Sequence, residues 1–305
     1  IAVWSEVFAT CYLLAAALQY DFQGLIDHLN AVQPVDGWFT EHYGGDPNDG
    51  VSVQADGRKK PWQRHNSRKL DAIRQEIDRL QLAPQVRAVA LTSLILALDR
   101  VDNTIGHYAA YLHHWSPRSY QPMHLTVPTV CPPNDHRVFR GDIFDVVGSI
   151  DADLAYFDPP YGSNNEKMPP SRVRYAAYYH VWSSICLNDC PEVFGKVRRR
   201  VDSTDTLAAS VFEEFRSDGD GRFIAVRAID RLLEATHCRW VLLSYSSGGR
   251  ATAKELHEVV SRHGRLRRVL EIDHRKNVMA GMQWTHQWLR DAEQPHREFL
   301  FLVEK

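Results

Sequence analysis

The 305-residue sequence has no excess of charge of one sign, because 36 lysine and arginine residues balance 38 aspartate and glutamate residues. This balance excludes a general basic field that would attract polyanions, so any contact with nucleic acid has to use local patches. Long apolar runs are also absent, since the longest, residues 11–18, is well short of the about 20 residues that span a bilayer. No segment has the pattern of a signal peptide. We therefore expect a soluble, cytoplasmic protein.

Cysteine is scarce, and its five positions are scattered and odd in number, which argues against a disulfide framework and favours reduced thiols. The five are Cys11, Cys131, Cys186, Cys190 and Cys238. The 15 histidines supply no paired zinc-ligand spacing, so no metal site is predicted. With 44% hydrophobic and 24% charged residues, the composition is that of an ordinary globular protein.

The length corresponds to roughly two domains, or to one large α/β unit with an insertion. The first residue is isoleucine and residues 1–4 already read as a strand, so we expect a truncated chain. Residues 1–28 are predicted to be the N-terminal part of an α/β core. Residues 29–135 are expected to form a mostly helical insertion, and residues 136–305 the second half of the core.

The periodicity of apolar residues predicts the individual elements. Helical spacing predicts helices over residues 7–20, 67–80, 85–100, 222–236 and 252–263, with residues 101–115 continuing the third. Short apolar or alternating runs predict strands over residues 1–4, 138–142, 154–157, 239–245, 266–272 and 298–303. Parallel strands are expected except for the last two, which we expect to be antiparallel. Residues 34–61 read as a loop and residues 162–221 as a polar segment.

The strongest local signal is Asp158-Pro159-Pro160-Tyr161, directly after the apolar run of residues 154–157. In open α/β sheets, ligands bind at the carboxyl ends of the strands. The exocyclic amine of adenine is a weak nucleophile, and an acceptor-only aspartate together with the carbonyl of Pro159 can hold its hydrogens. The prolines fix the backbone, and Tyr161 offers a flat face to a base extruded from a duplex. The alternative is that the prolines merely end the strand and that Asp158 caps a turn.

This tetrad resembles the catalytic motif of the DNA adenine methyltransferases of restriction–modification systems. Further stretches are similar to the same family, namely Tyr179-His180, residues 188–196, 69–74, 91–98, 103–108 and 244–249, Arg275 and residues 298–305. The resemblance implies a Rossmann-like, S-adenosylmethionine-dependent methyltransferase fold with a helical insertion. It also implies methylation of the exocyclic amine of adenine in double-stranded DNA, with Asp158, Pro159, Pro160 and Tyr161 as catalytic residues. Residues 29–135 would then hold target-recognition elements and residues 136–305 the catalytic half. A cognate restriction endonuclease is a further expected partner.

The resemblance also implies a set of cofactor-binding residues. The family's Phe-x-Gly-x-Gly loop has no counterpart in residues 1–30, and we expect it to precede the first residue. Glu6, expected at the end of a strand, would bind the ribose hydroxyls of S-adenosylmethionine. Asp142, with Ile143 beside it, would bind the amine of the cofactor's own adenine ring, and Asp158 would also face the cofactor. The alternatives are a glutamate favoured by a helix dipole at position 6 and a simple turn aspartate at position 142.

Two groups of basic residues are candidates for contacts with DNA phosphates, because one lies at the start of the predicted helices of the insertion and the other follows the tetrad. They are Lys59, Lys60, Arg64 and Arg68 in the first group and Lys196, Arg198, Arg199 and Arg200 in the second. The alternative for any charged cluster is a solvated surface, which is the interpretation favoured for residues 262–268.

Three other functions stay open on the sequence. The missing glycine loop would suit a non-catalytic DNA-binding remnant of such an enzyme. A nicotinamide-dependent oxidoreductase would need a Gly-x-Gly-x-x-Gly turn that the chain does not show. An N4-cytosine DNA methyltransferase would share the chemistry, but aspartate rather than serine at the first position of the tetrad favours adenine.

Overall fold

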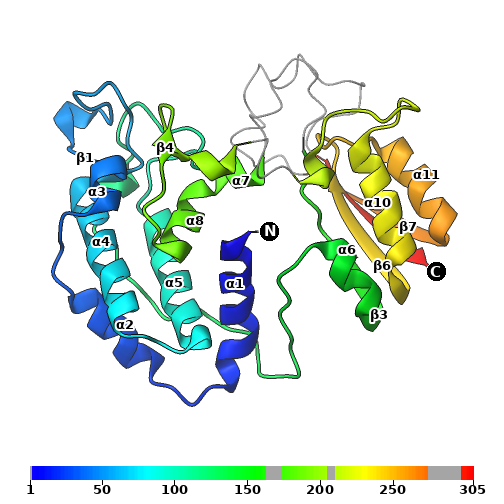
Figure 1. Cartoon of the computed structure of the whole chain (residues 1–305), viewed down its shortest axis with the longest axis horizontal. Helices are drawn as coiled ribbons and strands as arrows, with labels where there is room; N and C mark the ends of the chain where they lie inside the picture. Colours follow the sequence, from blue (N-terminus) through cyan, green and yellow to red (C-terminus); the bar gives the residue numbers. More distant parts are fainter. Residues whose placement is uncertain (1, 163–173, 205–209, 274–296) are drawn as a thin grey trace. The chain divides into compact units, whose positions relative to one another are not determined.

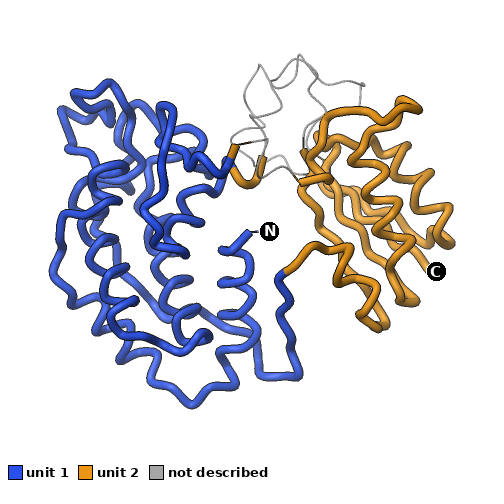
Figure 2. Tube along the Cα trace, viewed as in Figure 1, with its two compact units in different colours: residues 1–140, 177–203 blue, residues 141–176, 204–305 orange. Residues whose placement is uncertain are grey.

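The computed structural model describes residues 2–162, 174–204, 210–273 and 297–305. The chain divides into two compact units (Figure 2), of which unit 1 comprises residues 1–140 and 177–203 and unit 2 comprises residues 141–176 and 204–305. Unit 1 is built mainly of helices, whereas unit 2 is a sheet with helices packed on it (Figure 1). The protein is therefore mixed α/β. Among the described residues, no helix combines the length and the apolar character needed to cross a membrane.

Unit 1 is organised around helix α5 (Pro84–Asp99), which is buried on nearly every side. Its middle is apolar all round, as expected for a central helix, and a proline at its first position favours its start. The surrounding helices are α1 (Val3–Leu14), α2 (Phe22–Ala31), α3 (Trp38–Tyr43), α4 (Arg64–Arg79) and α8 (His180–Leu187), and their apolar residues share one core with α5.

Several short elements complete unit 1. The strands β1 (Gly44–Gly45) and β2 (Trp62–Gln63) form a parallel pair, and β4 (Val193–Phe194) and β5 (Arg199–Arg200) form an antiparallel pair. The 3-10 turns are η1 (Ala15–Ala17), η2 (Asn48–Gly50), η3 (Pro117–Tyr120) and η6 (Val201–Ser203). The short helix α7 (Tyr175–Tyr178) contains residues of both units.

Unit 2 contains a four-stranded sheet with the strand order β3-β6-β8-β7. The strands are β3 (Asp151–Phe157), β6 (His237–Ser246), β7 (Arg265–Asp273) and β8 (Arg297–Glu304). Strands β3 and β6 are parallel, and β8 runs antiparallel to both β6 and β7.

Helices α10 (Ile224–Ala235) and α11 (Ala253–His263) share a core with buried residues of β6 and β8 and lie together along the sheet (Figure 1). Helix α11 begins with a capping box, in which the side chains of Thr252 and Glu255 accept hydrogen bonds from each other's backbone N–H groups. The short elements α6 (Ile143–Val146), η4 (Val147–Ser149) and η7 (Val211–Glu213) complete unit 2.

Most of the predicted elements are confirmed. The helices predicted over residues 67–80, 85–100, 222–236 and 252–263 are α4, α5, α10 and α11. The strands predicted over residues 154–157, 239–245, 266–272 and 298–303 are β3, β6, β7 and β8, and the last two are antiparallel as expected. The helix predicted over residues 7–20 is α1, which begins and ends earlier.

Several predictions of secondary structure are wrong. The chain from Val3 is helical rather than extended, because its apolar residues recur at helical spacing and pack into the core of unit 1; residue 1 lies outside the described residues. Residues 138–142 form no strand. Residues 101–115 form a loop, since Asp102 and Thr104 hydrogen-bond to each other and Gly106 has a φ of +101°. Helix α8 lies within the predicted polar segment of residues 162–221.

The compact units divide the chain at other points than the predicted functional parts. Residues of α1 share a core with the helices of residues 29–135, and residues 177–203 join the same unit. The assignment of residues 1–28, 29–135 and 136–305 to parts of a catalytic core and an insertion stays a prediction.

Candidate active site

The tetrad of residues 158–161 lies at the edge of the sheet where three strands meet. The carboxyl ends of β3 and β6 lie at the same edge because these strands are parallel. The antiparallel β8 begins at that edge, since Ser246 at the end of β6 pairs with Glu298 near the start of β8. The topology thus brings Asp158, which follows β3, close to Ser244 and Glu298. This is the edge of an α/β sheet at which ligands bind.

The side chains of Asp158, Ser244 and Glu298 meet at the hydroxyl group of Tyr161. This hydroxyl lies 2.5 Å from Oδ1 of Asp158 and 2.5 Å from Oε1 of Glu298. The hydroxyl of Ser244 lies 3.1 Å from the Tyr161 oxygen and donates to Oε1 of Glu298 over 2.7 Å. Burial, followed by the hydrogen bonds to Asp158 and Glu298, raises the pKa of Tyr161 well above its ordinary value. The phenol therefore keeps its proton.

The main chain of the tetrad is fixed by the loop that follows β6. The carbonyl of Tyr161 accepts hydrogen bonds from the N–H of Arg250 (2.7 Å) and from the hydroxyl of Tyr245 (3.0 Å). The rings of Tyr161 and Tyr245 lie 4.9 Å apart. Gly162 follows with a φ of +62°, a conformation that favours glycine, and a Cβ there would lie 3.2 Å from Cα of Glu213. Tyr161 is thereby held at both its hydroxyl and its carbonyl.

The first two residues of the tetrad differ in exposure. Pro159 is buried, whereas Asp158 is exposed. The Asp158 carboxylate has one hydrogen-bond partner among the described residues, the hydroxyl of Tyr161, which donates to its Oδ1. The carboxylate can therefore reach a ligand at the sheet edge while its position is fixed through Tyr161.

Two of the predicted cofactor-binding residues lie at the start of α6 in unit 2. Asp142 caps this helix, because its carboxylate accepts a hydrogen bond from the N–H of Phe144 over 3.0 Å. Asp142 thus has a local role in capping the helix, and its role toward the cofactor stays a prediction. Ile143 is partly buried against the core of unit 2, the unit to which Asp158 also belongs.

The position predicted for Glu6 is wrong, because no strand precedes it within the described part of the chain. Glu6 lies in the first turn of α1 in unit 1, where a carboxylate interacts favourably with the helix dipole. Its Oε2 is paired with the guanidinium of Arg140 over 3.0 Å. The strand-end geometry on which the ribose-binding role rested is therefore absent from this segment.

The first predicted group of DNA-binding residues divides by exposure. Lys59 is exposed, and Arg64 and Arg68 both pair with the exposed Asp36 at 3.3 Å. Lys60 is buried, its ammonium group donates to the carbonyl of His42 over 3.0 Å, and burial lowers its pKa. A phosphate contact by Lys60 is not supported by this geometry.

The second group divides in the same way. Lys196 is exposed, and the guanidinium of Arg199 lies 4.9 Å from the centre of the Phe194 ring. Arg200 is only 3% exposed and forms two hydrogen bonds each with Asp189 and Asp202, at 2.6–2.8 Å. Burial would lower its pKa, but the bonds to the two aspartates raise it. Arg200 stabilises the fold of this segment and is not available to a phosphate.

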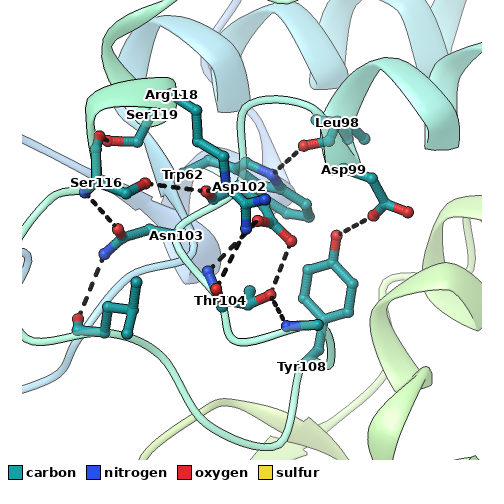
Figure 3. Close-up of polar contacts among 12 residues, drawn as sticks. Trp62, Leu98, Asp99, Asp102, Asn103, Thr104, Tyr108, Ser116, Arg118 and Ser119 are labelled. Atoms are coloured by element: carbon teal, nitrogen blue, oxygen red, sulfur yellow. Dashed lines mark hydrogen bonds and ion pairs between the residues drawn. The ribbon is translucent and has the colours of Figure 1, made fainter. Parts of the chain in front are cut away.

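A second polar cluster lies in unit 1, where the loop after α5 folds back on the end of that helix (Figure 3). Asp102 accepts hydrogen bonds from the hydroxyl of Thr104 (2.8 Å) and from the guanidinium of Arg118. The hydroxyl of Tyr108 donates to Oδ1 of Asp99 over 2.9 Å. Burial, and to a lesser extent the charge of Asp102, raises the pKa of Asp99 to about 6. The cluster fixes the loop that contains residues 103–108.

Ser244 and Glu298 were not predicted as site residues. The sequence marked Ser244 only as part of a motif after a strand, and Glu298 only as part of the final strand. Their link to the tetrad is produced by strand pairing, which places residues 83 and 137 positions beyond Tyr161 against its hydroxyl. Arg275, which the sequence also marked through the family resemblance, lies outside the described residues.

A family model of the D12 class N6 adenine-specific DNA methyltransferases matches residues 7–204 of the chain. This match covers more than half of the chain and includes the whole tetrad. The chain therefore belongs to the D12 class of N6 adenine-specific DNA methyltransferases. Ser244 and Glu298 lie beyond the matched residues.

Curated relatives agree with the family match. The chain is 26% identical over 249 residues to the type II methyltransferase M.FokI of Planomicrobium okeanokoites, an alignment that covers 79% of this chain and 34% of the relative. It is 28% identical over 201 residues to the modification methylase StsI of Streptococcus sanguinis (64% and 28%) and 23% identical over 246 residues to the type II methyltransferase M.NlaIII of Neisseria lactamica (79% and 65%). The chain thus spans less than two thirds of these relatives' length. No solved structure gives a significant match.

Proposed function

We propose that the protein transfers the methyl group of S-adenosylmethionine to the exocyclic amine of adenine in double-stranded DNA. It would act as the modification component of a type II restriction–modification system, with a cognate endonuclease as a further partner. The observation that carries the proposal is the exposed Asp158 carboxylate, held by Tyr161 at the carboxyl edge of a sheet within a matched methyltransferase family. The sheet of unit 2 is assigned to a Rossmann-like methyltransferase core.

The tetrad supplies the groups that this reaction requires. The adenine amine is a poor nucleophile because its lone pair is delocalised into the ring. The Asp158 carboxylate and the Pro159 carbonyl are acceptors that hold the amine hydrogens and orient the lone pair toward the methyl donor. Tyr161 offers its ring to the extruded base, and its hydroxyl is tied to the sheet, so the ring presents a fixed stacking surface.

S-adenosylmethionine, when bound, supplies an electrophilic methyl group. The residues of unit 2 suit part of a site for S-adenosylmethionine. Asp142 presents a carboxylate that can accept a hydrogen bond from the amine of the cofactor's adenine ring, and Ile143 beside it is partly buried and apolar. Asp142, Ile143 and Asp158 would hold the cofactor from unit 2.

DNA contacts are assigned to the basic residues that the structure leaves accessible. These are Lys59, Arg64, Arg68, Lys196, Arg198 and Arg199, of which Lys59, Arg64 and Lys196 are exposed and the others half-buried. Phosphate contacts by such residues position a protein on duplex DNA without reading its sequence. We assign target recognition to the helical region of residues 29–135.

The proposal is tested by incubating the full-length protein with duplex DNA and S-adenosylmethionine labelled in its methyl group, followed by digestion and nucleoside analysis. Labelled N6-methyladenine is the expected product. Labelled N4-methylcytosine would refute the choice of base and retain the methyltransferase. Binding of DNA without any transfer of label would favour a non-catalytic remnant.

A further inference from the structure

The hydroxyl of Tyr161 is shared by two carboxylates, although it carries a single proton. Its oxygen lies 2.5 Å from both Asp158 Oδ1 and Glu298 Oε1, so the two carboxylates compete for one donor. When the proton points to Asp158, one lone pair of Oδ1 is engaged. When it points to Glu298, Oδ1 is a stronger acceptor for an incoming amine.

Glu298 is placed differently from the other glutamate of the same strand. Glu304 pairs with the guanidinium groups of Arg239 and Arg267. Among the described residues, Glu298 has only hydroxyl partners, those of Tyr161 and Ser244, and no lysine or arginine lies within ion-pair distance. A carboxylate at this position is therefore not explained as one half of a surface ion pair within the described chain.

We propose that Glu298 is a positioning residue for methyl transfer, which acts by competing with Asp158 for the hydroxyl proton of Tyr161. This inference rests on the proposed function. This competition weakens the hydrogen bond to Oδ1 of Asp158 and so makes that oxygen a stronger acceptor for the amine hydrogens. Together with Ser244, Glu298 also keeps the Tyr161 ring in place. It does so without touching the base or the cofactor itself.

The substitution Glu298→Gln tests this role because it keeps the shape and removes the charge. A glutamine accepts the phenolic proton less strongly, and its amide group can donate to the Tyr161 oxygen, which commits the proton to Asp158. The expected result is a fall in kcat of about ten- to a hundredfold, the effect of a hydrogen bond to a charged group, with KM for DNA changed by less than about threefold. The matched control Glu304→Gln, in the same strand, should leave both constants close to those of the parent.

A double-mutant cycle with Tyr161→Phe shows whether Glu298 acts through the hydroxyl. In the Tyr161→Phe background there is no proton to share, so Glu298→Gln should cause little further loss of kcat. Glu298→Asp provides a second test that does not depend on the folding of the glutamine variant. It should retain more activity than Glu298→Gln, because it keeps the charge although it changes the length.

Three results would overturn the inference. They are a kcat of Glu298→Gln within about twofold of the parent, an equal loss when Glu298→Gln is added to Tyr161→Phe, and a higher activity of Glu298→Gln than of Glu298→Asp. The last order would indicate that packing rather than charge matters at this position. A full-length parent protein that transfers no methyl group in the same assay would overturn the proposed function and this inference together.

Discussion

Asp99, which is half-buried at the end of α5, gives a quantitative prediction about how the stability of the protein depends on pH. The pKa of Asp99 rises from 3.8 to about 6, chiefly because of burial. Between these values the native state keeps a proton that the unfolded state has released, so the free energy of unfolding falls as pH rises through about 6. The full effect is about 3 kcal/mol, and about 1 kcal/mol of it falls between pH 5 and pH 7.

The substitution Asp99→Asn removes this titration and keeps an oxygen that can accept the hydrogen bond from Tyr108. The variant should gain about 1 kcal/mol relative to the parent between pH 5 and pH 7. Urea denaturation followed by tryptophan fluorescence measures the difference, because Trp62 and Trp182 lie in unit 1 with Asp99. A difference between variant and parent that does not change with pH would refute the burial argument.

Asp78→Asn is a matched control of opposite character. Burial would raise the pKa of Asp78, but hydrogen bonds from Arg74 and Asn188 hold this pKa below its ordinary value. Asp78 is then ionised in both the native and the unfolded state at pH 5 and at pH 7. Its substitution should lower stability by the same amount at both pH values, which separates the loss of a bond from a titration.

Three further predictions concern the proposed activity. Asp158→Ala should reduce methyl transfer by about a hundredfold or more, an effect of about 3 kcal/mol, with S-adenosylmethionine affinity within a few-fold by calorimetry; greater residual activity would reject its role. Neutralising Arg198 and Arg199 together should weaken binding to all DNA sequences alike and lower the slope of log binding constant against log salt concentration by about two. Arg200→Ala should lower the melting temperature instead. An altered sequence preference at an unchanged slope would contradict this assignment. Tyr161→Ala should cost about 1–3 kcal/mol of base capture, measured by DNA binding, and Tyr161→Trp should retain more; equal losses would argue against stacking.

The sheet of unit 2 was largely predictable because its strands carry strong local signals. Short apolar runs beside helices with clear 3.6-residue periodicity identify β3, β6, α10 and α11 without reference to tertiary contacts. The prediction of a strand over residues 1–4 is wrong because an apolar run of four residues does not distinguish a strand from a helix. Tertiary packing of Trp4 favours the helix, since its ring lies 5.0 Å from the ring of Tyr179 and 5.3 Å from that of Trp182, both far away in the sequence.

The basic residues show a second limit of sequence reasoning. Arg198, Arg199 and Arg200 are equivalent as a charge run, and nothing in their order marks one of them as buried. The difference arises from β5, whose pairing with β4 and position beside α8 turn Arg200 toward Asp189 and Ser184. Exposure, and with it the capacity to contact a phosphate, is a property of the tertiary structure.

The position of Glu298 at the edge of the sheet could be predicted in part from the sequence. The strands over residues 154–157, 239–245 and 298–303 were all predicted, the last as antiparallel to the strand before it, and all are present, whereas their order in the sheet was not predicted. An antiparallel strand beside the neighbour must begin where that neighbour ends, so the first residues of β8 have to lie at the same edge as Asp158. What the sequence could not supply is the pairing register, because a shift of one residue would turn Glu298 to the opposite face of the sheet, away from Tyr161. The site is therefore set by topology at the level of strands and by register at the level of side chains.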